Sequence, residues 1–414
     1  MLTDARTPLI LVAGMTATGS QAIADALLDE HTLVVQHDLS KLADGVVRRR
    51  VRHGGRDRAT VHPLTHGCVS CALREELLPL LRTVAGGPQE CRVVLHLDPV
   101  LEPETVCWAI DHLVVDGRTG VDGMRVQAVI TVLDAARWLA DATGSELLRT
   151  RGMAAWPGDG RSTAQLAVGQ VEFADALVVA GAAPDVGTAQ RTDAVLDRLA
   201  PIAPRARAAG LDVAALLAAV PSGSRRGRVD DAHAVLAPRD YPQYEEHGVG
   251  TVFFRARRPF HPGRLHTALA GLLSGVVRTR GRMWVATRPD EVLALESAGG
   301  VLRVTPAGCW LGAVADWSQI DVERALMASL RWDDRFEDRE QALLVVFHAA
   351  APEAITGALD AALVTDAELA VGEREWRTWS DPFGSFHTDP CSPSHRGYEE
   401  DAAEQDRDRR PGSR

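Results

Sequence analysis

The sequence is almost without lysine. Lys41 is the only one in 414 residues, so all but one of the 45 Lys and Arg residues are arginine. Such a bias is typical of GC-rich coding, and it weakens any argument that rests on a preference for arginine alone. Cysteine is scarce as well, because six Cys in so long a chain exclude a scaffold built on disulfides.

Long apolar runs are also missing. No run reaches membrane-spanning length, and no long apolar segment precedes the first predicted strand. We therefore expect a cytoplasmic protein with no membrane partner. A hydrophobic content of 46% with 24% charged residues is ordinary for a globular chain, and the length predicts two domains or more. The net charge of −11 argues against a protein that binds nucleic acid over its whole surface.

The most informative segment is Gly14-Met15-Thr16-Ala17-Thr18-Gly19, which has the G-x-x-x-x-G spacing of a phosphate-binding loop. The apolar run Pro8–Ala13 precedes it, and a helix pattern follows over Ala22–Glu30. A working loop continues with a lysine for the β- and γ-phosphates and a Ser or Thr for Mg²⁺. Here those positions hold Ser20 and Gln21. The sequence therefore predicts a nucleotide-hydrolase scaffold that has lost its nucleotide chemistry and functions by binding.

Residues 1–205 show the alternation of strand and helix patterns that predicts an α/β domain. Such alternation favours a mostly parallel sheet covered by helices, with the last expected strand before residue 205. The predicted strands are Leu9–Ala13, Thr32–Gln36, Arg92–Leu97, Val126–Leu133 and Ala176–Ala180, with helices such as Ala72–Val84 and Thr105–Leu113 between them.

The rest of the chain divides into three further parts. Residues 206–247 contain an Ala-rich helix pattern and Pro-Ser-Gly punctuation, which predict a linker. Residues 248–385 mix strand and helix patterns, which predict a second domain of the α+β class. Residues 386–414 are polar and charged, and we expect a disordered tail.

Several further segments show recognisable motifs: Gly67–Cys71 with the helix pattern after it, Val132–Ala135, Gln170 with Ala174-Asp175, Arg257–Phe260, Arg278–Trp284, Glu296–Gly300 and Asp338-Arg339. Together they resemble the CobW family of P-loop GTPases and zinc metallochaperones, over most of the chain. The resemblance implies a P-loop domain followed by a CobW C-terminal-type domain. It also implies one candidate function, zinc transfer coupled to GTP.

The chain departs from the family pattern at three nucleotide-binding elements. The loop lacks its lysine and its Mg²⁺ ligand. His96–Pro99 replaces a Glu-(Thr/Ser)-Thr-Gly-like run, and Ala180–Ala183 stands where an Asn-Lys-x-Asp would contact guanine. We therefore expect a pseudo-GTPase that is not an enzyme and does not use GTP as a cofactor.

Four short strings carry a narrower resemblance: His66–Cys71, Glu172–Asp175, Arg278–Arg282 and Asp381–Gly384. Together they resemble an actinobacterial branch of the family, the ribosome-hibernation-factor recruiting or Mrf branch. It implies a non-enzymatic adaptor that helps to recruit a hibernation-promoting factor to the ribosome under zinc starvation. The implied partners are the ribosome, its RNA and that factor.

A candidate zinc site lies at Cys68 and Cys71, with His66 two residues before the first cysteine. Zn²⁺ favours tetrahedral nitrogen and sulfur ligands, and one turn can direct two thiolates at one ion. However, Ser70 replaces the middle cysteine of the family motif. Two interpretations stay open: a zinc site, or two reduced thiols that cap the following helix.

Arginine is concentrated after the second predicted strand, at Arg48, Arg49, Arg50 and Arg52. Guanidinium groups on an outward loop suit phosphate contacts, so these residues are our candidates for contact with ribosomal RNA. The alternative is a solvated surface loop. For the arginines of Arg278–Arg282, which alternate along a predicted strand, we expect the wet side of the second sheet.

Overall fold

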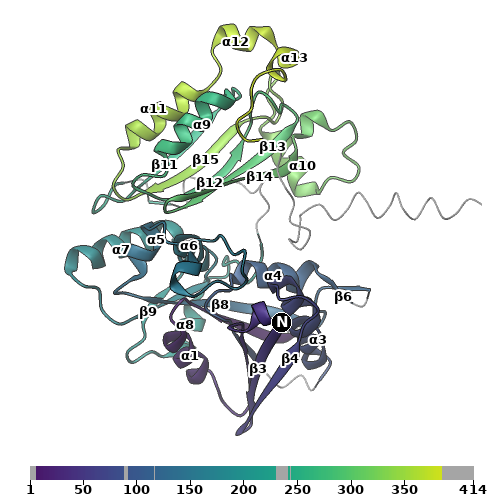
Figure 1. Ribbon diagram of the computed structural model, residues 1–414, viewed down its shortest axis with the longest axis vertical. Coiled ribbons are helices and arrows are strands. Elements are labelled where there is room, and N and C mark those ends of the chain that lie inside the picture. The colour runs from purple at the N-terminus through teal and green to yellow at the C-terminus, as the bar shows by residue number, and fades with distance from the viewer. Residues whose placement is uncertain (1–5, 88–91, 116, 230–240, 243, 385–414) are drawn as a thin grey trace, which may run out of the picture.

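The computed structural model describes residues 6–87, 92–115, 117–229, 241–242 and 244–384. These residues form two domains, each built on one large sheet (Figure 1). Helices α5 (Trp138–Thr143), α6 (Thr163–Glu172) and α7 (Val186–Leu199) lie between the two sheets (Figure 1). The predicted tail at 386–414 falls outside the described residues.

The first domain has an eight-stranded sheet in the order β10-β9-β8-β1-β5-β2-β3-β4. The six strands from β10 to β2 run parallel, and β3 and β4 are antiparallel additions at one edge. The predicted mostly parallel sheet is therefore confirmed. Its strands are β1 (Thr7–Ala13), β2 (Thr32–Asp38), β3 (Val46–His53), β4 (Arg56–Pro63), β5 (Arg92–His96), β8 (Met124–Asp134), β9 (Ala176–Ala180) and β10 (Arg205–Arg207), while β6 (Val114–Val115) pairs with β7 (Arg118–Thr119).

Both faces of this sheet are covered, and β1 shows why its sequence is continuously apolar. Leu9 and Leu11 enter one core, whereas Ile10 and Val12 enter the core on the opposite face. Successive side chains of a strand point to opposite faces, so a strand covered on both sides must be apolar throughout. One face is covered by α1 (Ala17–Ala26) and α8 (Val213–Ala219), and the other by α2 (Val69–Cys71), the π-helical turn η2 (Ala72–Leu77), α3 (Leu78–Ala85) and α4 (Pro103–His112).

The start of the predicted linker belongs to the first domain. Strand β10 pairs with β9, and Val213, Leu216 and Val220 pack in the core beneath α1. The predicted Ala-rich helix is α8, which begins after its N-cap Asp212. Residues 206–220 are thus part of a packed layer. The sequence did not indicate this, because the few apolar positions that pack in the core are hard to distinguish among the alanines.

The second domain has a five-stranded antiparallel sheet in the order β11-β15-β12-β13-β14. Helices α9 and α11 cover one face (Figure 1). Strand β15 is buried along its whole length, because Leu343 and Val345 pack under these helices and Val346 packs against the first domain. The elements are β11 (Gly250–Ala256), α9 (Pro262–Gly271), β12 (Val276–Met283), β13 (Glu291–Ala298), β14 (Val301–Cys309), α10 (Val322–Leu330), β15 (Gln341–Phe347), α11 (Pro352–Ala362), α12 (Asp366–Val371) and α13 (Glu373–Trp376).

A buried carboxylate joins the two domains. Glu172 at the end of α6 lies 2.9 Å from the guanidinium of Arg278 and 3.1 Å from that of Arg280, both on β12. The expectation that these arginines line the wet side of the sheet was wrong, since their side chains are only 13% and 20% exposed. Their partner is more than a hundred positions away in sequence.

The domains approach closely where glycine leaves room. A Cβ at Gly299 would lie 2.2 Å from the carbonyl oxygen of Gly144, and Gly299 has φ +53°. Beside it, Gly300 N–H donates to the Gly144 carbonyl at 3.3 Å. A larger residue at Gly299 would therefore separate the β13–β14 turn from the loop after α5.

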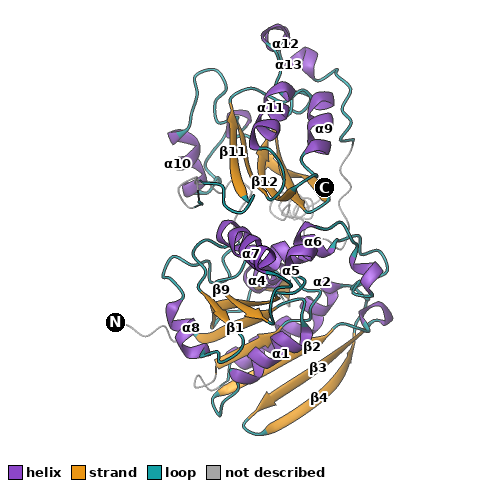
Figure 2. Cartoon of the chain, turned by 90° about the vertical axis from the view of Figure 1, so that its left-hand side faces the viewer, coloured by secondary structure: helices purple, strands orange, loops and turns teal. Residues whose placement is uncertain are grey.

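The arginine-rich segment after the second strand is a strand, so the expectation of a loop was wrong. Residues 46–53 form β3, which pairs with β2 on one side and β4 on the other. Figure 2 shows β3 and β4 as a hairpin at the edge of the first sheet. The strand was not recognised from the sequence, because its arginines suggest a solvated loop. In the structure these arginines lie beside carboxylates from other segments.

We expect Glu172→Gln to lower the free energy of unfolding by about 3 kcal/mol, because it removes the buried carboxylate that Arg278 and Arg280 share in the interface. Chemical denaturation followed by tryptophan fluorescence measures this change. Arg50→Gln is the matched control, since the Arg50–Asp57 pair is half exposed and its loss leaves stability nearly unchanged. Equal stability of Glu172→Gln and the parent protein would contradict the role of this pair.

Candidate functional site

The predicted phosphate loop is shorter than a nucleotide-binding loop. Strand β1 ends at Ala13, and α1 begins at Ala17, ahead of the two positions, Ser20 and Gln21, that would contact a nucleotide. The helix thus starts earlier than the predicted Ala22. Thr16 caps the helix and accepts the N–H of Gly19 at 3.3 Å. The N–H groups of Gly19 and Ser20 are thus bonded to Thr16 within the chain, whereas a phosphate loop directs such groups at its ligand.

Gly14 is required by packing against the neighbouring strand. A Cβ there would lie 2.3 Å from the carbonyl oxygen of Val132 on β8, and Gly14 has φ +150°. The first glycine of the motif therefore has a structural reason that is independent of any nucleotide.

Ser20 faces the interior of the domain. Its hydroxyl is buried and lies 2.9 Å from Nε2 of His96 at the end of β5, and it donates to the Thr16 carbonyl at 3.0 Å. Burial lowers the pKa of His96 to about 4, and the charge of Arg52 adds to this effect. Gln21 turns outward and donates to Asp25 at 2.8 Å. Neither residue is placed to replace the missing lysine or the Mg²⁺ ligand.

Two residues that carry the family resemblance support the fold. The amide of Gln170 donates to the carbonyls of Pro99 and Leu101, at 3.1 and 3.0 Å. Asp175 accepts the N–H of Val129 and that of Arg226, both at 2.9 Å. These contacts fix the segment after β5 and the start of β9.

The cysteine motif lies at the start of a helix that follows β4. Cys68 is the N-cap of α2, and its sulfur accepts the N–H of Cys71 at 3.4 Å. The sulfur of Cys71 lies 3.6 Å from Nδ1 of His66. Cys71 thus contacts both His66 and Cys68, and Cys68 also takes the capping role of the alternative interpretation. Both cysteines are partly exposed, so the motif is open to solution.

Sequence reasoning missed a fourth candidate metal ligand, Glu75. It stands on the π-helical turn η2, where its carboxylate accepts the N–H of Thr65 at 2.8 Å and interacts with the Cys71 thiol. Burial and the neighbouring groups Cys68 and Glu75 raise the pKa of Cys71 to about 12. The signal in the sequence was its position four residues after Cys71, which faces the same side of a helix.

Next to Glu75, a buried ionic cluster connects the motif to the sheet. Glu76 is 4% exposed, contacts the imidazole of His37 on β2, and lies 2.5 Å from the guanidinium of Arg49 on β3. Burial alone would raise the pKa of Glu76, but His37 and Arg49 hold it below its usual range. Arg49 is therefore a structural residue beneath the cysteine motif.

The other candidate arginines of β3 also lie beside carboxylates. Arg50 pairs with Asp57 at 2.5 Å, Arg52 with Asp25, and Arg48 lies 4.0 Å from Asp38. Acids thus compensate the charge of this strand. The predicted contact with ribosomal RNA stays a prediction.

Comparison with known proteins identifies the family. Residues 26–207 match the family described as CobW/HypB/UreG, nucleotide-binding domain, and residues 249–363 match the cobalamin synthesis protein cobW C-terminal domain. A Mycobacterium tuberculosis protein named zinc chaperone Rv0106 is 45% identical over 403 residues, which cover 93% of this chain and 95% of that protein. The chain belongs to the CobW family.

More distant similarities extend over most of this CobW chain. The zinc-regulated GTPase metalloprotein activator 1 of Dictyostelium discoideum is 25% identical over 403 residues, covering 91% of this chain and 83% of that protein. A crystal structure of the Zn(II)-bound YjiA GTPase from E. coli is 13% identical, with a TM-score of 0.36, and covers 87% of this chain and 99% of its own.

The match of this CobW chain to the nucleotide-binding family begins at residue 26. The segment Gly14–Gln21 lies before it. This family match therefore covers the domain from residue 26 onward and does not include the Gly14–Gln21 segment. No helix in the described part of this CobW chain has the length and apolar character needed to cross a membrane.

The donors at the cysteine motif suit zinc, although they are not yet gathered around one point. A tetrahedral zinc ion holds its sulfur and nitrogen ligands about 3.5 to 3.6 Å apart, and Cys71 and His66 are separated by 3.6 Å. Across the described ranges, no group of three or more His, Cys, Asp or Glu side chains is already arranged to hold a metal ion. Zinc binding in this CobW chain would require the neighbouring side chains to turn toward the ion.

The buried His96 predicts a loss of stability in mild acid. Its pKa is about 4 in the folded chain and near 6.5 when unfolded, so its contribution is fully present above pH 6.5 and is lost as the pH falls to 4. The loss amounts to about 3 kcal/mol. Denaturation of the parent protein and of His96→Gln across this range measures the difference.

Glutamine can keep a hydrogen bond to Ser20 but does not titrate, so stability should fall less steeply with acid in that variant. His31→Gln is the control, because its side chain is 70% exposed. A stability difference between parent protein and His96→Gln that stays constant with pH would contradict the assignment.

Proposed function

We propose that this protein is a zinc metallochaperone of the CobW type that works without hydrolysing a nucleotide at its phosphate loop. The observation that carries the proposal is the 3.6 Å separation of the Cys71 sulfur and the His66 imidazole, with Cys68 in the same helical turn. The name of the 45% identical relative, zinc chaperone, supports the same metal.

The proposed zinc site uses Cys68, Cys71 and His66, with Glu75 as the fourth donor. Thiolate and imidazole ligands favour zinc over Mg²⁺ or Ca²⁺, which prefer oxygen. Zinc would supply a positive charge that favours the thiolate form of both cysteines. Both cysteines are partly exposed, so the metal could be reached from solution. Such a site suits a protein that passes the metal on.

The short connection before α1 supports handling of zinc without GTP turnover. Gly19 and Ser20 use their N–H groups within the chain, and Ser20 is held against His96. The proposed zinc ligands come from the segment 66–75 after β4, so they do not depend on a bound triphosphate. GTP-dependent transfer, which the family resemblance implied, therefore has less support here than zinc binding.

The hypothesis of a ribosome adaptor remains a prediction from the resemblance alone. The four arginines of β3 lie beside carboxylates, and an RNA phosphate would have to compete with them. The comparisons support zinc handling more than ribosome binding.

We expect Cys71→Ser to weaken zinc binding at least about 100-fold, because changes in outer-shell partners alone cost 10–100-fold. Competition with a chromogenic chelator measures the affinity. Cys309→Ser is the matched control, since Cys309 is an exposed cysteine outside the motif. An affinity of Cys71→Ser equal to that of the parent would remove the site.

Glu75→Gln separates the carboxylate from its structural role. The amide oxygen of glutamine can still accept the Thr65 N–H, so the fold of the turn is kept while the charge is lost. We expect zinc affinity to fall about 10-fold or more. In the Co²⁺-substituted protein, the sulfur-to-metal absorption should persist in Glu75→Gln and decrease in Cys71→Ser. Unchanged zinc affinity of Glu75→Gln would limit the donors to the other three residues.

We expect no GTP hydrolysis above background, because the chain has no ammonium group at the loop and α1 starts before Gly19. Phosphate release measures it, with Gln21→Ala purified in parallel to expose contaminating activity. Turnover that is present in the parent and lost in Gln21→Ala would show that the loop works with other residues.

A further inference from the structure

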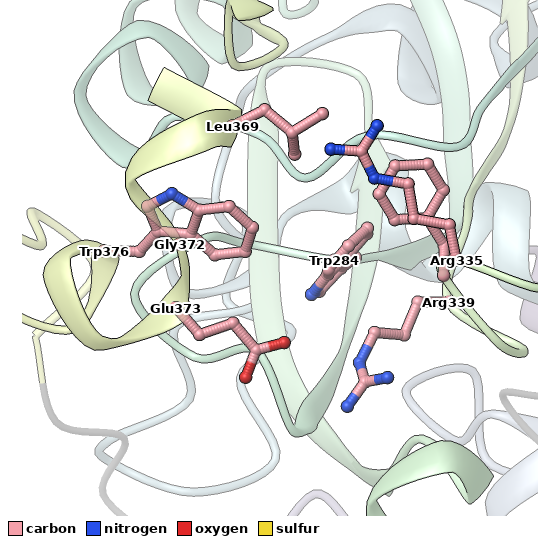
Figure 3. Close-up of a pocket in the computed structure, with 8 residues that line it drawn as sticks. Trp284, Arg335, Arg339, Leu369, Gly372, Glu373 and Trp376 are labelled. Carbon is pink, nitrogen blue, oxygen red and sulfur yellow. The ribbon is translucent and has the colours of Figure 1, made fainter. Parts of the chain in front are cut away.

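A second candidate site lies in the C-terminal domain, outside the zinc motif. It is a hollow of about 140 Å³ between the end of β12, the loop before β15 and the turn from α12 to α13 (Figure 3). Its lining residues are Trp284, Arg335, Phe336, Arg339, Leu369, Gly372, Glu373 and Trp376.

Aromatic rings form the walls of this hollow. The ring of Trp284 lies edge-to-face against Phe336, at 5.7 Å and 63°, and against Trp376, at 6.3 Å and 72°. A cavity of about 150 Å³ with apolar walls can hold benzene. The hollow is therefore large enough for the flat body of a small organic molecule.

The indole N–H of Trp284 lacks an acceptor. Trp284 is 1% exposed, and its Nε1 has no hydrogen-bond partner among the described residues. By contrast, Trp376 donates to the Glu368 carbonyl at 2.7 Å. In Figure 3 the nitrogen of Trp284 lies at the end of the ring that faces Glu373 and Arg339. A buried donor without an acceptor is costly, and an acceptor on a ligand would remove that cost.

Two arginines and one acid line the hollow, which favours an anionic acceptor. Arg339 is held by the Pro289 carbonyl at 2.9 Å and by the carboxylates of Glu337 and Asp290, so its charge is largely compensated, and its guanidinium lies 5.9 Å from the centre of the Trp284 ring. Arg335 stacks on Phe336 at 5.1 Å, and within the described chain no carboxylate lies within ion-pair distance of it. Among the lining residues, Glu373 alone opposes an anion.

We propose that this hollow binds a small organic carboxylate. Its apolar body lies among the rings of Trp284, Phe336 and Trp376. Its carboxylate accepts the Trp284 N–H, and the charge of Arg335, which lies within ion-pair distance of no described carboxylate, favours an anion.

Titration of the full chain with benzoate, followed by tryptophan fluorescence, tests this proposal. Trp284→Phe keeps the ring and removes the N–H, so we expect benzoate binding to weaken about 10-fold, as for a hydrogen bond to a charged group. Trp310→Phe is the matched control, because Trp310 is also 1% exposed with an N–H that lacks a partner among the described residues, and it lies outside the hollow.

Two exposed charges give variants that should fold normally and act in opposite directions. We expect Arg335→Gln to weaken benzoate binding about threefold and Glu373→Gln to strengthen it by a similar factor, as for partly screened charges. Benzyl alcohol and benzylamine should bind less tightly than benzoate. Equal binding by Trp284→Phe and the parent would overturn the proposal. So would tighter binding of benzylamine with loss in Glu373→Gln, which would assign the hollow to cations.

Discussion

The way the chain leaves strand β1 constrains what the first domain can bind. This strand lies between β5 and β8, and only Gly14, Met15 and Thr16 connect it to α1. With so short a connection the helix begins before Gly19, and its N-cap Thr16 takes the N–H that a phosphate would otherwise accept. The loss of the lysine is therefore not an isolated substitution. A lysine at position 20 alone would be placed toward His96 in the interior, where an ammonium group is costly.

Two consecutive acids after the cysteine motif have different roles. Glu75 lies beside the proposed metal donors, and Glu76 holds the turn to the sheet. Glu75 faces Thr65 and Cys71 at the surface, while Glu76 is buried with His37 and Arg49. A π-helical turn places both, and such turns are frequent at functional sites. The turn that carries the proposed metal donors is thereby fixed to β2 and β3. A rotation of the Cys71 or Glu75 side chain on metal binding would therefore start from a turn whose backbone is held by Glu76.

The sequence was a good guide to elements whose burial can be read from apolar runs. Strands β1, β5 and β9 were predicted close to their observed bounds, because each is covered on both faces. It was a poor guide where charge is buried. Strand β3 and the arginines of β12 look solvated, yet their partners, such as Glu76 and Glu172, come from distant segments. Such pairs depend on tertiary contacts that local patterns do not encode.

The candidate sites show the same limit. Cys68, Cys71 and His66 could be named from spacing, since they lie within one turn and its approach. Glu75 lies on the next helical turn, where it could equally have been a solvated acid, and the Trp284 hollow joins residues separated by about ninety positions.

Helix α6 connects the two domains of the molecule. Near its end, Gln170 holds the segment after β5 through the carbonyls of Pro99 and Leu101, and Glu172 holds both arginines of β12. His96 lies at the end of that same strand β5. The end of the central sheet and the docking of the second domain thus share one short helical segment. The second domain is accordingly held as a fixed cover over α5, α6 and α7, because moving it would expose a carboxylate and two guanidinium groups that are now paired and largely buried.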